Sequence, residues 1–134
     1  FLFFVYPPCF SQIKQQDHLI DKQLKVCLDS VENQSTAGMI RCTGNAYNLW
    51  DMEMNKYYKL LMDKILTLDE KQKLKSAQQK WVEFRDNEFT FIEMAYGNMQ
   101  GSMWSVVSAG KKMETVKQRT LDIKAYYDSL TLDK

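Results

Sequence analysis

Residue types able to do chemistry are few in this chain, and their spacing argues against catalysis. The sequence holds one histidine, His18, and no histidine–carboxylate pair spaced to bind zinc or iron. It also lacks a glycine-rich phosphate loop, a nucleophile elbow and a Cys–His arrangement. Since no acid–base pair can be assigned, we predict a protein that is not an enzyme and that uses no metal or cofactor. We interpret His18 as a solvated residue.

The most distinctive segment is 77–88, which contains a tryptophan, an aromatic–arginine–aspartate triplet and a glutamate in that order. On a helix, steps of three and four residues place Trp81, Arg85 and Glu88 on one face. An arginine on such a face is expected to bury its stem and to pair its guanidinium with carboxylates. The candidate carboxylates are those of Glu88, Asp51 and Glu53. Such a partly buried ion pair would fix the register of the helix.

The alternative is that this segment forms a binding surface, because tryptophan, tyrosine and arginine are enriched in interface hot spots. The residues of that surface are Trp81, Phe84, Arg85, Asp86 and Glu88. A second candidate surface is a glycine-flanked turn with three methionines around it, Met94, Met99 and Met103.

The segment and its surroundings resemble the LprI-type N-terminal family of lysozyme inhibitors, small helical proteins of bacterial envelopes. The resemblance runs from about Asp21 to Leu121. Its remaining positions are Cys27-Leu28, Ser35–Met39, Cys42, Ala46, Trp50-Asp51, Asn55, Tyr58, Ala77-Gln78, Gly101-Ser102 and Gln118-Arg119. The resemblance implies an exported protein that binds and inhibits a lysozyme-type muramidase. The other interpretations are an envelope scaffold module with a different partner and a small-ligand carrier that uses the aromatic-lined interior.

The chain departs from the family pattern at two places that many members fill with cysteine. Here Phe89 follows Glu88, and Gly110 or Lys111 occupies the second place. Both partners of a second disulfide, between the third and fourth helices, are therefore absent together.

Composition limits the class of protein. With 134 residues, 45% of them hydrophobic, the chain can bury one core, so we expect a single domain over residues 12–134. Eighteen basic and 17 acidic residues give a formal charge of +1, which offers no general attraction for nucleic acid or for an anionic membrane.

The first eight residues, Phe1–Pro8, form an uncharged apolar run that we interpret as the end of a truncated secretory signal peptide. We place the signal peptide at residues 1–11, with cleavage after Ser11, and predict a periplasmic or secreted protein without a transmembrane segment. Two alternatives are a lipoprotein modified at Cys9 and an ordinary N-terminal strand or arm.

Cleavage would leave two of the three cysteines, Cys27 and Cys42, in an oxidising compartment. Because both also belong to the family pattern, we predict a disulfide between them. The alternative is a pair of buried free thiols.

Both prolines lie in the apolar run, so long helices are allowed after it. Hydrophobic periodicity predicts helices at about 18–30, 36–66, 68–96 and 102–130, the third one beginning with a capping box. The predicted core stripe of the third helix is Leu74, Ala77, Trp81, Phe84, Glu88 or Phe89, Ile92 and Ala95. The fold class is therefore all-α, an antiparallel bundle of three long helices and one short N-terminal helix, in which short loops set successive helices side by side.

Overall fold

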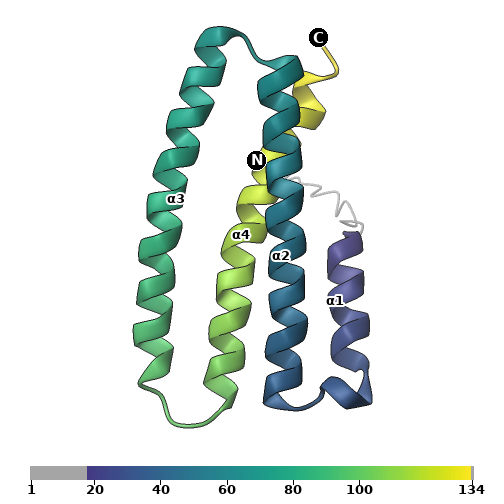
Figure 1. Ribbon diagram of the computed structural model, residues 1–134, viewed down its shortest axis with the longest axis vertical. Helices are drawn as coiled ribbons and strands as arrows, with labels where there is room; N and C mark the ends of the chain where they lie inside the picture. The colour runs from purple at the N-terminus through teal and green to yellow at the C-terminus, as the bar shows by residue number, and fades with distance from the viewer. Residues whose placement is uncertain (1–17, 134) are drawn as a thin grey trace, which may run out of the picture.

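The computed structural model describes residues 18–133, which form helices and no strands. The four α-helices are α1 (Leu19–Asp29), α2 (Thr36–Leu60), α3 (Leu68–Gly97) and α4 (Met103–Leu130) (Figure 1). A 3-10 turn, Val31–Asn33, follows α1, and a π-helical turn, Leu61–Ile65, extends α2. The all-α prediction is confirmed. The predicted signal peptide, residues 1–11, and the alternative at Cys9 lie outside the described residues.

Side chains at the helix starts explain where the helices begin. The Ser35 hydroxyl accepts a hydrogen bond from the Gly38 amide at 3.0 Å. At α3, the Glu70 amide donates to the Thr67 hydroxyl at 3.3 Å, and the Thr67 amide donates to the Glu70 carboxylate at 2.8 Å. These reciprocal bonds form the predicted capping box.

His18 differs from the expectation of a solvated residue. Its Nδ1 atom accepts a hydrogen bond from the Ile20 amide at 3.2 Å and so caps α1. Its ring is half-buried, with its centroid 4.5 Å from that of Trp50. The histidine therefore has a structural role, because the cap and the tilted ring contact both fix the start of α1 against α2.

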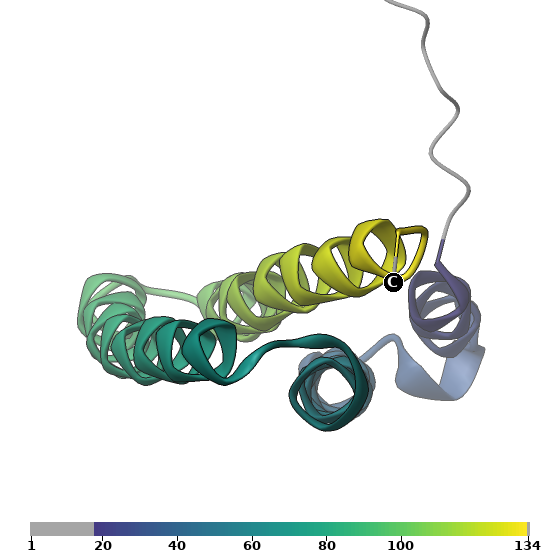
Figure 2. The same cartoon turned by 90° about the horizontal axis from the view of Figure 1, so that it is seen from above.

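The densest packing lies between α2 and α4, with α1 added at the side of α2 (Figure 2). Trp50 of α2 and Val116 and Ile123 of α4 are fully buried. Between them, the buried Thr120 hydroxyl donates to the Trp50 carbonyl at 2.9 Å. The same hydroxyl lies 2.8 Å from the Val116 carbonyl of its own helix. The contact with Trp50 therefore links α4 to α2 through a buried polar group whose hydrogen-bonding capacity is met.

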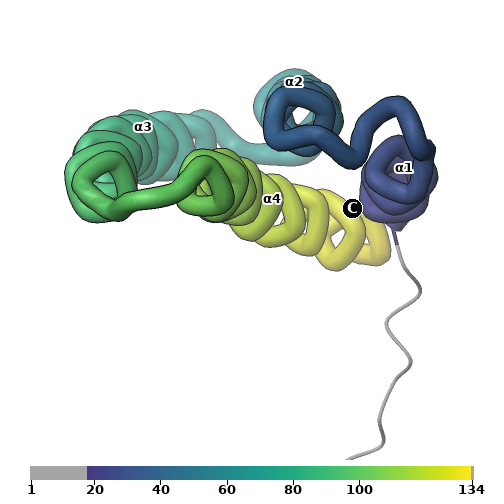
Figure 3. Tube along the Cα trace, turned by 90° about the horizontal axis from the view of Figure 1, so that it is seen from below, coloured from purple at the N-terminus to yellow at the C-terminus, as the bar shows by residue number. Residues whose placement is uncertain are grey.

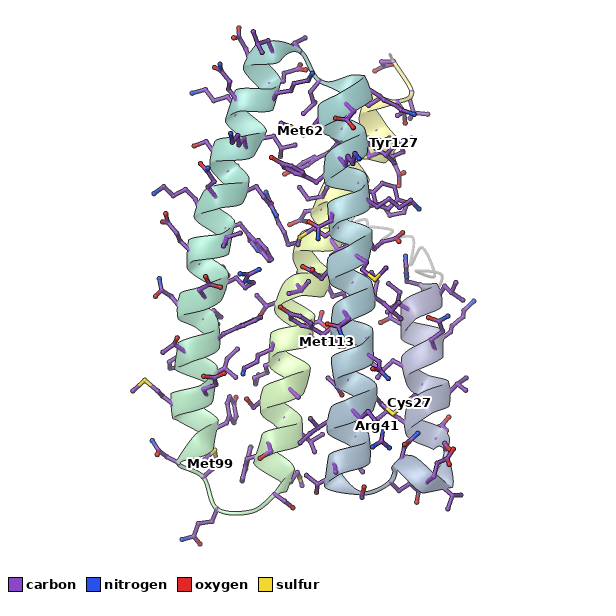
Figure 4. All side chains as sticks on the ribbon, in the orientation of Figure 1. Cys27, Arg41, Met62, Met99, Met113 and Tyr127 are labelled. Carbon is purple, nitrogen blue, oxygen red and sulfur yellow. A yellow bond between two sulfur atoms is a disulfide. The ribbon has the colours of Figure 1, made fainter. Side chains whose placement is uncertain are left out.

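A disulfide joins Cys27 of α1 to Cys42 of α2, as predicted, with a Cα–Cα distance of 5.8 Å. Nearby, a Cβ atom at Gly38 would lie 2.6 Å from the backbone of Asn33, so only glycine allows the turn to approach α2 this closely. The Asn33 amide group donates to the Cys27 carbonyl at 3.1 Å, and Arg41 donates to the Asn33 side chain. Figure 4 shows Cys27 and Arg41 together at this end of α1 and α2.

Helix α3 departs from the predicted bundle. A two-residue turn joins it to the end of α2, yet it packs on α4 rather than along α2 (Figures 1 and 3). Ile92 is its one buried residue. The prediction that Ala77, Phe84 and Ala95 belong to the core is wrong, because all three are exposed, the Phe84 ring by 54%. A short connection makes two helices antiparallel, but it does not force them into contact along their length.

Candidate functional site

Trp81 of α3 lies between two grooves, one on each side of its helix. The α2–α3 groove has a volume of about 440 Å³, and the α3–α4 groove about 560 Å³. The α2–α3 groove is lined mainly by Asp51, Asn55, Tyr58, Gln78, Trp81 and Arg85. The α3–α4 groove is lined mainly by Trp81, Phe84, Glu88, Phe91, Gln118 and Arg119. Of the predicted binding surface, Trp81 is therefore shared, Phe84 and Glu88 line the α3–α4 groove, Arg85 lines the α2–α3 groove, and Asp86 lines neither.

Trp81, Arg85 and Glu88 lie within about 60° of one another around the helix, so they share one face as expected. The two edges of that face line different grooves, because Arg85 lines the α2–α3 groove and Glu88 lines the α3–α4 groove with Phe84. The wide spacing of α3 from its neighbours then exposes both sides of the Trp81 face.

Arg85 also has a different carboxylate partner from those predicted. Its Nε and Nη2 atoms donate to Asp86 Oδ1 at 2.9 and 2.7 Å. Its guanidinium lies 5.5 Å from the centre of the Trp81 ring. Across the described residues, no ion pair joins Arg85 to Glu88, Asp51 or Glu53. The Asp86 side chain is 62% exposed, so the pair is open to water and contributes less to folding than the predicted buried pair.

The α2 wall of the α2–α3 groove carries three positions of the family pattern that sequence reasoning did not assign to a site. Asp51, Asn55 and Tyr58 follow one another at helical steps and all line the groove. The Asn55 amide group donates to the Asp51 carboxylate at 3.4 Å. The sequence did indicate a role for these residues, because polar family-pattern residues spaced three and four apart on a helix are hard to explain by core packing alone.

Gln78 and Arg119, two further pattern positions, meet between helices. Arg119 Nε donates to Gln78 Oε1 at 2.9 Å, and Gln78 Nε2 donates to the sulfur of Met54 at 3.6 Å. This chain of contacts joins α4 to α3 and α3 to α2. We therefore interpret Gln78 and Arg119 as residues that position the groove walls.

Phe89, which stands where many family members have cysteine, also connects α3 to its neighbours. Its ring centroid lies 6.1 Å from that of Tyr47 on α2, and Lys112 of α4 lies 5.7 Å above the ring. Lys112 also forms an ion pair with Glu93. Burial raises the pKa of Tyr47, and the nearby Arg85 guanidinium opposes that rise. Side-chain contacts thus bridge the helices that a second disulfide would have joined.

The second candidate surface is exposed. Met94, Met99 and Met103 are all largely accessible, and Figure 4 shows Met99 at the turn between α3 and α4. No cavity brings these three side chains together among the grooves that line the described helices.

Within residues 18–133, no helix is long and apolar enough to cross a membrane. No group of three or more histidine, cysteine, aspartate or glutamate side chains in the same range is arranged to hold a metal ion.

Comparisons with known proteins place this architecture. A crystal structure of an uncharacterized protein from Burkholderia thailandensis is similar, with a TM-score of 0.81 and 26% sequence identity. The alignment covers 87% of this chain and 57% of that chain, so this chain spans little more than half the length of that relative. No match is found among curated proteins. The model of the lysozyme inhibitor LprI family matches residues 27–123, which is well over half of the sequence, and the chain therefore belongs to the LprI family.

Proposed function

We propose that this protein is an exported, non-enzymatic binding protein of the bacterial envelope that inhibits a lysozyme-type muramidase. Its place of action would be the periplasm or the outside of the cell. Membership of the LprI family supports this proposal.

We assign the contact to the α2–α3 groove. The single observation that carries this assignment is the gathering of family-pattern residues there: Asp51, Asn55 and Tyr58 from α2, with Gln78, Trp81 and Arg85 from α3. Tryptophan, tyrosine and arginine supply most of the energy at many protein interfaces. The groove combines these three with hydrogen-bonding groups at its rim, which is the usual composition of an interface centre and its edge.

The charge balance predicts how such a complex forms. A formal charge of +1 gives no long-range attraction to a basic muramidase. Binding should therefore depend on the aromatic groups of the groove and should weaken only mildly between low and physiological salt.

A lysis assay tests the proposal. The protein should slow cell-wall lysis by at least one of the chicken-type, goose-type and invertebrate-type lysozymes, with saturation near an equal molar ratio. If all three enzymes are unaffected by a tenfold molar excess of the protein, inhibition is rejected, and a pull-down from envelope extract then tests the scaffold interpretation.

Two exposed asparagines of α2 provide a matched pair for locating the contact. Asn55 lines the α2–α3 groove, whereas Asn48 lines neither groove beside α3. We expect Asn55→Ala to weaken inhibition and Asn48→Ala to leave it unchanged, with both variants melting like the parent. Equal inhibition by the two variants would move the contact away from this groove.

A further inference from the structure

We propose that a second copy of this chain packs against the Phe84 side of α3, which borders the α3–α4 groove, antiparallel to it and with a two-fold axis at Phe84. The proposal goes beyond muramidase inhibition and is independent of it. Self-association would use the edge of α3 that borders the α3–α4 groove and not the edge that carries Arg85.

The surface begins with two exposed aromatic rings. Phe84 and Phe91 are 54% and 62% exposed, and they lie seven residues apart, which places them on nearly the same line along the helix. Ala77 lies seven residues before Phe84 on that line and is also exposed. The stripe from Ala77 to Phe91 is about 21 Å long at the rise of an α-helix. Large apolar side chains in such a row mark an interaction surface more often than single exposed ones do.

Charges of opposite sign flank Phe84 on the same side of the helix. Lys80 lies four residues before it and Glu88 four residues after it, so all three belong to one ridge. Lys80 pairs with Glu83 at 3.2 Å, and both of those side chains are largely exposed. Glu88 is half-buried beside the α3–α4 groove and takes part in no ion pair within residues 18–133.

This order of residues is complementary to itself under a two-fold axis. With the axis at Phe84, the two Phe84 rings meet, and Lys80 of each copy lies opposite Glu88 of the other. The small Ala77 of each copy lies opposite the large Phe91 of the other. A two-fold interface requires that a residue and its counterpart exchange roles in this way, and charge and size both satisfy the requirement.

Other registers are less favourable. A parallel arrangement places Lys80 against Lys80 and Glu88 against Glu88. An antiparallel arrangement with its axis at Lys80 or at Glu88 also brings two like charges together, which costs free energy. The charges therefore select the register centred on Phe84.

The proposed dimer surface and the muramidase contact meet at Trp81, which lines both grooves, and are otherwise separate. Arg85 and Asp51 line the groove on the other side of α3. A contact built on one helix stripe lies at the small end of specific interfaces, so we expect a dissociation constant in the micromolar range.

Sedimentation equilibrium of the full chain, from low to high micromolar concentration, tests the proposal. We expect a monomer–dimer equilibrium. Lys80→Glu and Glu88→Lys should each raise the dissociation constant by about tenfold or more, because the two-fold axis repeats each like-charge contact. The double variant K80E/E88K exchanges the two charges and should restore the parent value.

Control variants distinguish the loss of this contact from an effect of total charge and from misfolding. Lys59→Glu and Glu32→Lys change the total charge by the same amounts at exposed positions off α3, and they should leave the equilibrium unchanged. Lys80→Glu should melt like the parent, since the Lys80–Glu83 pair is exposed and contributes little to folding. Because Glu88 is half-buried, thermal melts of the Glu88→Lys and double variants establish that they are folded. A chain that stays monomeric, a dimer that neither single variant weakens, or a folded double variant that stays weak would each overturn the proposal. The assay contains no muramidase, so its result does not depend on the proposed function.

Discussion

Helices α2 and α3 have similar lengths and the same hydrophobic period, yet they are used in different ways. Six residues of α2 are buried, including Trp50 and Met54, because α1 and α4 both pack on it. In α3 the one buried residue is Ile92, because that helix packs mainly on α4. Family-pattern residues such as Ala46 and Trp50 on α2 therefore belong to the core, whereas Trp81 and Arg85 on α3 border open grooves.

The largest expected difference between the two regions concerns their tryptophans. Trp50 is fully buried, whereas Trp81 is half-buried between two grooves. Trp50→Ala should lower the free energy of unfolding by about 3–5 kcal/mol, because it removes the largest side chain of the core. Trp81→Ala should cost roughly half as much, since water already reaches one side of that ring. Denaturant unfolding at equilibrium measures both losses, and equal losses would contradict the assigned division between core and site.

The disulfide should make the next largest contribution to the free energy of unfolding, and it joins α1 to α2. Protein from an oxidising host should contain the Cys27–Cys42 bond, which intact mass and thiol titration detect. Replacing both cysteines by serine should lower the free energy of unfolding by roughly 3 kcal/mol in a chain-entropy model. Amide hydrogen exchange should then rise first in α1, because the bond joins that helix to α2. Two free thiols in protein recovered from a periplasm would contradict this prediction.

Alanine substitutions at two glycines of α2, Gly38 and Gly44, test how closely the turn after α1 approaches α2. Gly38→Ala should destabilise the protein by about 1–3 kcal/mol, because the new methyl group meets the Asn33 backbone. Gly44→Ala adds the same methyl group where nothing lies within 4 Å. It should stabilise the helix by up to about 1 kcal/mol. Thermal melts of the two variants should move in opposite directions, and a neutral Gly38→Ala would show that the turn can move away.

Arg85→Ala should have the smallest effect on folding. Its partner Asp86 is exposed, so we expect a loss of less than about 1 kcal/mol in the free energy of unfolding. Inhibition of a muramidase should weaken, because the guanidinium and the Trp81 ring it covers both line the α2–α3 groove. Lys25→Ala, which removes an exposed ion pair with Asp29 on α1, is the matched control and should leave inhibition unchanged. A loss near 3 kcal/mol at Arg85 would instead support the buried ion pair that the sequence suggested.

The elements of the fold could be predicted from the sequence because their signals are local. The capping box at Thr67 and Glu70 depends on residues three positions apart, and the structure confirms it. The bounds of all four α-helices agree with the predicted ones to within two residues, once the π-helical turn is counted with α2. The Cys27–Cys42 pairing followed from two cysteines and a family pattern that contains both.

The use of each helix face was decided only by tertiary structure. Periodicity showed that Phe84 lies on an apolar stripe, but a stripe does not say whether another helix covers it. The sequence offers Arg85 carboxylates on two helices as well as at the next position along the chain. Its choice of Asp86 follows from the distance between α2 and α3, which no local pattern encodes. The sequence thus determined the helices and the covalent link between two of them, whereas the packing of α3 on α4 determined which pattern residues face the grooves.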